Sequence, residues 1–323
     1  MSDKIRIAFF GAGDISNLHA EAINETANAE LAGIWNRTKS KAEAKAAEFG
    51  CKVYDTVEDV LNDASVDAVF VLTNMETHKE YAVKILNAGK HCLVEKPTAC
   101  TIEEIEEIIE ARDASGKQCA PVHNYIYEPS VWRAKELLES GKFGKLCSFY
   151  MMYNIHHPEE VCARYPGIIR QILTHHAYTM IFLAGNPKTV SCLKATINDG
   201  SVDQENIAMA NLQMESGSLS HICASFASDD HSGDPWTCVI KIIGQDGAAR
   251  FTYRDWVENK PAVVHSQTYS CYPYSIKNTA QHFINKCIGE GEPPLSSLED
   301  AITCQRIIEA CEKSVAEGVH VNL

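Results

Sequence analysis

Apolar and polar positions in the first part of the chain alternate in a way that predicts a parallel sheet with connecting helices. Short apolar runs are separated by longer segments with helical periodicity, a rhythm typical of βαβ units. The expected strands are 4–10, 29–35, 67–72, 91–94 and 119–122, and the expected helices begin near residues 17, 40, 77 and 101. The first part is therefore expected to be an α/β domain over residues 1–122.

The pattern changes after residue 146. The apolar runs become rich in Thr, Ser and Tyr, and short turns join several of them, which predicts antiparallel hairpins. The expected strands are 147–155, 188–197, 206–214, 218–226, 237–244 and 249–253, with one helix over 168–185 and two more from about 276 and 298. A chain of 323 residues is long for one core, so we predict a second α/β domain over 123–323, whose C-terminal tail is a candidate to pack back on the first.

The composition of the chain indicates which kinds of binding partner and which cellular compartment to expect. The chain carries 43 acidic and 29 basic residues, a net charge of −14, without a dense Lys/Arg block, which argues against nucleic acid and anionic membranes as partners. No apolar run approaches the ~18 residues of a membrane helix. The 13 cysteines form no C-x-x-C pair, and no signal peptide precedes the first strand, so reduced thiols and a cytoplasmic location are expected.

A glycine-containing loop follows the first predicted strand in the segment FFGAGDIS. In this place, backbone can approach a pyrophosphate and the N–H groups of the next helix can face it. The candidate cofactor residues here are Gly11, Gly13, Asp14, Ile15 and Ser16. The alternative is a plain turn between a strand and a helix.

The second predicted strand ends without the carboxylate that would bind the ribose of NAD. Asn36 and Arg37 stand there, followed by Thr38 and Lys39. Since a guanidinium suits a 2′-phosphate, these residues favour NADP weakly over NAD. The alternative is a solvated basic start of a helix.

The apolar run 91–94 stops at Glu95, Lys96 and Pro97. Carboxyl ends of parallel strands are where open α/β sheets bind ligands. An ammonium there can contact both a nicotinamide and a substrate hydroxyl and can hold developing negative charge. The alternative is an exposed ion pair of little energetic value.

These motifs resemble the glucose-fructose oxidoreductase / inositol dehydrogenase (Gfo/Idh/MocA) family over essentially the whole chain. The matching segments are GAGDIS, VLTNMETHKEYAVKILNAGKHCLVEKP, HNYIYEP with SGKFGK, LAGNP after a histidine, and the tail from Ala301. The resemblance implies a Rossmann domain, a second domain with an open, mainly antiparallel sheet, and hydride transfer at a sugar or polyol carbon. It also implies a dimer or tetramer, and a Lys96–Pro97 bond able to be cis.

The resemblance also implies roles for single residues. Lys96 would contact nicotinamide and substrate, and the residues expected on the cofactor side are Thr73, Asn74, His78 and Glu95. In the helix 168–185, His175 matches the family's catalytic histidine, while Gln171 stands in place of the family's aspartate four residues earlier. A neutral amide cannot take a proton as that carboxylate could, but an imidazole still can.

Further polar and aromatic residues are candidates for the substrate. In HNYIYEP, Asn124 matches the family's asparagine, whereas Tyr125 stands where arginines are frequent in the family. Tyrosine suits stacking on a neutral sugar, and packing at the domain interface is the alternative for Tyr125. Histidine pairs at 156–157 and 175–176 raise a metal site as an alternative, but neighbours on a strand or helix point in different directions, so none is predicted. His156 and His176 are retained as substrate candidates, although packing is an alternative for each.

The predicted function is an NAD(P)-dependent oxidoreductase acting on a neutral sugar, cyclitol or glycoside, with Lys96 and His175 as catalytic residues. Two alternatives stay open from the sequence. One is a redox-neutral sugar-processing enzyme with tightly held NAD(H). The other is a non-catalytic sensor or scaffold, which the missing aspartate would explain.

Overall fold

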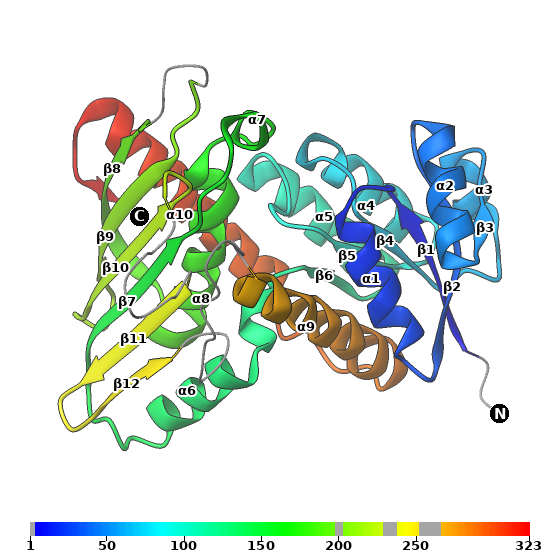
Figure 1. The fold of residues 1–323 in the computed structure, drawn as a ribbon. Coiled ribbons are helices and arrows are strands. Elements are labelled where there is room, and N and C mark those ends of the chain that lie inside the picture. Colours follow the sequence, from blue (N-terminus) through cyan, green and yellow to red (C-terminus); the bar gives the residue numbers. More distant parts are fainter. Residues whose placement is uncertain (1–3, 198–202, 229–237, 252–265) are drawn as a thin grey trace. The chain divides into compact units, whose positions relative to one another are not determined.

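The computed structural model describes residues 4–197, 203–228, 238–251 and 266–323 (Figure 1). The chain forms two compact units, one of residues 1–124 and 273–302 and the other of residues 125–272 and 303–323. The predicted α/β class is confirmed, with a parallel sheet in the first unit and a mainly antiparallel sheet in the second. None of the helices in the described ranges has the length and apolar character needed to cross a bilayer.

The first unit contains a six-stranded parallel sheet in the order β3-β2-β1-β4-β5-β6. Its strands are β1 (Ile5–Phe10), β2 (Ala29–Trp35), β3 (Lys52–Val53), β4 (Ala68–Val71), β5 (His91–Val94) and β6 (Cys119–Pro121). Its helices from the first part of the chain are α1 (Ile15–Asn24), α2 (Lys39–Phe49), α3 (Val57–Asn62), α4 (His78–Asn87) and α5 (Ile102–Ser115). The pattern missed β3 and α3 because neither is long enough to show a period.

Helices cover both faces of this sheet, as expected of strands that are apolar on both sides. One face packs Phe10, Val71 and Val94 against α3, α4 and α5. On the other face Phe70 meets Phe283 edge to face, with ring centroids 6.2 Å apart. Both faces of the sheet whose carboxyl ends carry the candidate site are thus packed against other elements.

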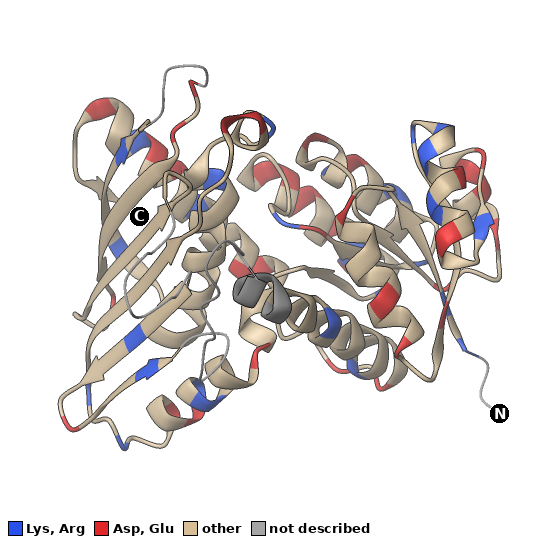
Figure 2. Ribbon diagram, viewed as in Figure 1, with Lys and Arg blue, Asp and Glu red and all other residues tan. Residues whose placement is uncertain are grey.

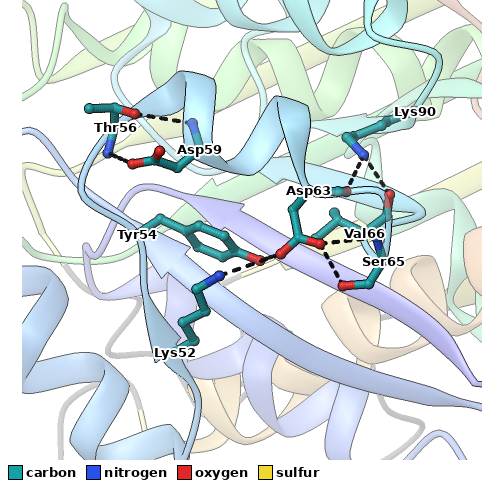
Figure 3. Close-up of polar contacts among 8 residues, drawn as sticks. All are labelled: Lys52, Tyr54, Thr56, Asp59, Asp63, Ser65, Val66 and Lys90. Atoms are coloured by element: carbon teal, nitrogen blue, oxygen red, sulfur yellow. Dashed lines mark hydrogen bonds and ion pairs between the residues drawn. The ribbon is translucent and has the colours of Figure 1, made fainter.

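Polar contacts fix the connection from β3 through α3 to β4 (Figure 3). Thr56 and Asp59 cap α3 reciprocally, which satisfies two amide groups at its N-terminus. Asp63 accepts from the Tyr54 hydroxyl at 2.8 Å, and the buried Lys90 ammonium donates to the carbonyls of Asp63 and Val66. The side chain of the residue just before β5 therefore closes the loop that leads into β4.

The second unit contains a seven-stranded sheet in the order β12-β11-β7-β10-β9-β8-β13, in which only β7 and β10 pair in parallel. Its strands are β7 (Leu146–Asn154), β8 (Pro187–Ala195), β9 (Ile207–Met214), β10 (Leu219–Ser225), β11 (Cys238–Gly244), β12 (Ala248–Phe251) and β13 (Val321–Asn322). These strands carry few charges (Figure 2). The last two residues of the strand predicted over 249–253 lie outside the described residues.

The helices after residue 124 differ in detail from the predicted ones. They are α6 (Pro129–Glu139), α7 (Glu159–Cys162), α8 (Thr174–Ala184), α9 (Ser266–His282) and α10 (Leu298–Glu317). A single α-helix over 168–185 was wrong, since residues Ile169–Leu173 form a π-helix before α8. Helix α9 begins ten residues earlier than expected and continues as a second π-helix, Phe283–Gly289. Periodicity could not reveal either π-helix, because their apolar positions also suit an α-helix.

Candidate active site

The loop between β1 and α1 has the shape of a pyrophosphate cradle. Gly11 has φ +115°, and a Cβ there would lie 2.4 Å from the Leu72 carbonyl oxygen, so only glycine fits. At Gly13 no atom lies within 4 Å of the position that a Cβ would take, which leaves the backbone open to a ligand. No side-chain hydrogen bond caps the start of α1. The residues present therefore fit the pyrophosphate of a dinucleotide.

The other residues of this loop take different positions. Asp14 is exposed and Ile15 is half-buried. Ser16 is fully buried, and both its backbone N–H and its hydroxyl donate to the Gly13 carbonyl, at 3.0 and 2.6 Å. Ser16 thus shapes the loop from inside, instead of presenting its hydroxyl to solvent.

The end of β2 is joined to the same loop through Asn36. Its Oδ1 accepts from the Ala12 N–H at 3.1 Å, and its Nδ2 donates to the Thr38 carbonyl at 3.0 Å. Arg37 is exposed, whereas the neighbouring Lys39 forms an ion pair with Asp55 at 2.6 Å. Of these two cations, Arg37 is the one whose guanidinium is open to a ligand.

His78 connects the ends of β4 and β5. Its Nε2 lies 3.0 Å from the Thr73 carbonyl, and its Nδ1 lies 2.8 Å from the Pro97 carbonyl. Burial lowers the pKa of His78, while the two carbonyls act in the opposite direction. Asn74 lies at the start of the 3₁₀ turn Met75–Thr77, and the Lys96–Pro97 peptide is cis. His78 therefore holds the turn after β4 against the segment that carries Lys96.

Lys96 is half-buried directly after β5. Burial lowers the pKa of its ammonium to about 8, and the charge of the adjacent Glu95 opposes this shift. Glu95 is 6% exposed. One of its carboxylate oxygens lies 3.0 Å from His19 Nε2, and the other accepts from the Lys96 backbone N–H at 3.1 Å. An amine whose pKa lies near neutrality can hold or release a proton under ordinary conditions.

In the second unit, His175 lies among tyrosines. It is 2% exposed, and its Nδ1 lies 2.5 Å from the Tyr178 hydroxyl. The Tyr125 ring stacks on it with 4.3 Å between centroids, and the Tyr125 N–H donates to the same hydroxyl at 3.3 Å. His175 thus has a phenol as a neighbour where the family's aspartate would supply a carboxylate.

Gln171 and His176 share this helical segment but differ from His175. Gln171 is half-buried in the π-helix, and its N–H donates to the Gly167 carbonyl. His176 is fully buried near the Tyr153 ring, and neither of its nitrogens has a hydrogen-bond partner. Burial lowers the pKa of His176 to about 3, so it stays neutral in the folded protein.

The two remaining candidates lie in other surroundings. Asn124 is fully buried, and its amide donates to the Ser275 hydroxyl at 2.5 Å, both within the first unit. His156 is exposed on the wall of a cavity of about 280 Å³ in the second unit, which Asn206 and Phe226 also line. No group of three or more His, Cys, Asp or Glu side chains in the described parts of the chain is arranged to hold a metal ion.

Neither His19 nor Tyr178 was predicted from the sequence. His19 lies on the buried stripe of α1 with Ser16, Ala20 and Ile23, and a polar residue at such a position was a usable signal. Tyr178 follows His175 by three residues, a spacing at which helical side chains meet. No signal in the sequence singled out its hydroxyl among the chain's 12 tyrosines.

The parallel sheet, the glycine loop and the lysine at the end of β5 define a dinucleotide-binding α/β protein. Residues 5–123 match the model of the oxidoreductase family with an NAD-binding Rossmann fold, and residues 131–250 match the GFO/IDH/MocA C-terminal domain. The chain belongs to the Gfo/Idh/MocA family of oxidoreductases, as its motifs predicted.

Relatives of known name cover most of the chain. An inositol 2-dehydrogenase of Rhizobium meliloti is 23% identical over 99% of both chains. A scyllo-inositol 2-dehydrogenase (NADP(+)) of Bacillus subtilis is 26% identical over 78% of this chain and 80% of its own. Among solved structures, scyllo-inositol dehydrogenase from Lactobacillus casei with NAD(H) and scyllo-inositol has the same fold, with a TM-score of 0.87 at 19% identity over 99% of both chains.

Proposed function

We propose that the protein transfers a hydride between a nicotinamide dinucleotide and a hydroxyl-bearing carbon of a neutral sugar, cyclitol or glycoside. The inositol dehydrogenases among its relatives support this class of substrate. The residues packed around His175 support a neutral substrate, because the Tyr125 ring that stacks on it and the Tyr178 hydroxyl that contacts it carry no charge to attract a phosphate or carboxylate.

The observation that carries the proposal is Lys96, a half-buried lysine with a pKa of about 8 at the carboxyl end of a parallel strand. A bound nicotinamide supplies the hydride acceptor. The Lys96 ammonium donates to the substrate oxygen and stabilises the charge that develops as the carbonyl forms. His175 accepts the hydroxyl proton, directly or through water.

Replacing Lys96 tests this function. Lys96→Met keeps the length of the side chain without its charge, and turnover of myo-inositol or scyllo-inositol should fall roughly 10²- to 10³-fold. The affinity for the dinucleotide should change little. Lys79→Met, which removes a partly exposed ammonium paired with Glu107, is the matched control. Near-normal turnover by Lys96→Met would remove Lys96 from the mechanism, and absence of turnover by the wild type on any polyol would favour the sensor function.

For the cofactor we propose NADP, held at its 2′-phosphate by Arg37. Arg37→Ala should weaken NADPH binding by about tenfold or more, since a charge-assisted phosphate contact contributes roughly 1.5–3 kcal/mol. Binding of NADH should change little. Lys39→Ala is the control, because Lys39 is already paired with Asp55. A thermal-shift titration of each protein with both reduced cofactors measures this, and a wild type selective for NADH would contradict the assignment.

We further propose a homo-oligomer that works in the cytoplasm. Large apolar side chains are exposed on neighbouring strands of the second sheet, and contiguous apolar surface of this kind marks interfaces. They include Tyr150, Met152, Leu193, Met209 and Leu219. None of the 12 cysteines in the described residues forms a disulfide, which suits a reducing compartment. Light scattering of the purified chain gives the assembly, and a monomer at micromolar concentration would contradict it.

A further inference from the structure

We propose that His19 is a positioning residue for Lys96 and acts through Glu95. The proposal rests on the proposed role of Lys96. It assigns a functional task to the helix that follows the glycine loop, because His19 lies on α1 and Lys96 follows β5.

The contact between His19 and Glu95 has a defined direction. His19 Nε2 lies 3.0 Å from a Glu95 carboxylate oxygen, while Nδ1 is buried without a hydrogen-bond partner. A buried N–H without an acceptor is costly, so the proton of a neutral His19 resides on Nε2, which donates to Glu95. Both residues are at least nine-tenths buried, and water does not compete for this bond.

The ring of His19 is fixed by its neighbours. It meets Phe70 and Phe9 edge to face, with centroid separations of 5.5 and 6.4 Å. These phenylalanines lie on β4 and β1, in the middle of the sheet. His19 is therefore a rigid donor that holds the carboxylate of Glu95 in one place.

The position of that carboxylate determines the environment of Lys96. Its second oxygen accepts the Lys96 backbone N–H at 3.1 Å, and its charge counteracts the effect of burial on the ammonium. Without the donor on His19, the carboxylate loses one of its two contacts and can rotate away from Lys96. The pKa of the Lys96 ammonium should then fall further, because burial still lowers it and the nearby negative charge that raises it is lost.

Two amide variants separate this role from simple packing. In His19→Gln the side-chain amide nitrogen reaches the place of Nε2, whereas in His19→Asn it reaches only the place of Nδ1. Both variants put a polar amide among the same phenylalanines. A purely structural role predicts that the two behave alike, while a donor to Glu95 predicts rescue by Gln alone.

The primary readout is the titration of Lys96 itself, which needs no substrate. Reductive ¹³C-methylation and NMR follow each lysine, and the Lys96 signal is the one that Lys96→Arg removes. The midpoint should stay at the wild-type value in His19→Gln and fall in His19→Asn. Glu95→Gln, which removes the charge and keeps the shape, should lower it with His19 intact. An unchanged midpoint in both His19→Asn and Glu95→Gln overturns the proposal, as does a His19→Gln that titrates like His19→Asn.

Kinetics give the second readout. Turnover of myo-inositol or scyllo-inositol should fall by about tenfold to a hundredfold in His19→Asn, with KM and the thermal shift by NADPH little changed, and His19→Gln should restore most of it. If Lys96→Met turns over normally, the proposed function fails, but the titration still decides whether His19 positions the amine. If Lys96→Met loses turnover but the titration midpoint of Lys96 is unchanged in the His19 variants, only the role of His19 is contradicted.

Discussion

The two units hold their candidate catalytic residues by different means. Lys96 follows a strand, and backbone groups and a buried carboxylate fix its surroundings through Glu95 and His78. His175 lies on a helix, and aromatic rings fix it through stacking by Tyr125 and contact with Tyr178. We call the surroundings of Lys96 the charged half, because they include the Glu95 carboxylate, and the surroundings of His175 the neutral half, because the contacts just named for it are with uncharged aromatic groups.

The largest effect expected in the neutral half comes from His175. His175→Asn removes the group proposed to accept the hydroxyl proton, and turnover should fall roughly 10²- to 10⁴-fold. Steady-state oxidation of the same polyols measures it. His320→Asn changes an exposed histidine of the same unit that has no proposed role and should leave the rate near that of the wild type. Equal losses in the two variants would mean that the loss in His175→Asn does not report the removal of a base.

The charged half was easier to predict from the sequence. Its key residues follow strands whose apolar runs are visible, so Gly11, Gly13, Lys96 and the strand bounds around them could be placed. The partners were harder to find, because contacts such as His19 with Glu95 join positions 76 apart in the chain. In the neutral half the π-helix before α8 altered the expected geometry at Gln171. Which tyrosine meets His175 depended on packing that periodicity does not describe.

The buried His176 gives the next largest effect, and it concerns stability. Its folded pKa of about 3 lies below the ordinary value of 6.5, so below pH 6.5 the unfolded chain binds a proton that the folded chain does not. Stability therefore falls as the pH drops from 6.5 towards 3, by roughly 2 kcal/mol at pH 5 from this residue alone. His176→Leu should lose that share of the pH dependence, as measured by urea unfolding at pH 7 and pH 5.

His123 should also contribute to the acid sensitivity, because burial lowers its pKa to about 3. It belongs to the first unit, so part of the acid sensitivity should persist in His176→Leu. If His176→Leu kept the full acid sensitivity of the wild type, the pKa of His176 in the folded protein would not be lowered by burial.

The smallest effect is expected from a change at Tyr178. This change tests whether the Tyr178 hydroxyl replaces the family's aspartate, for which Gln171 stands in this chain. Tyr178→Phe keeps the ring and removes the hydroxyl that His175 Nδ1 and the Tyr125 N–H both contact. Both hydrogen bonds are lost, each worth ~1 kcal/mol. Loss of the one to His175 should reduce turnover by several-fold, and the melting temperature should fall modestly. Tyr150→Phe, on the exposed face of β7, is the control. A fall in melting temperature with an intact rate would make the hydroxyl a packing element, and His175 would then work without an orienting partner at Nδ1.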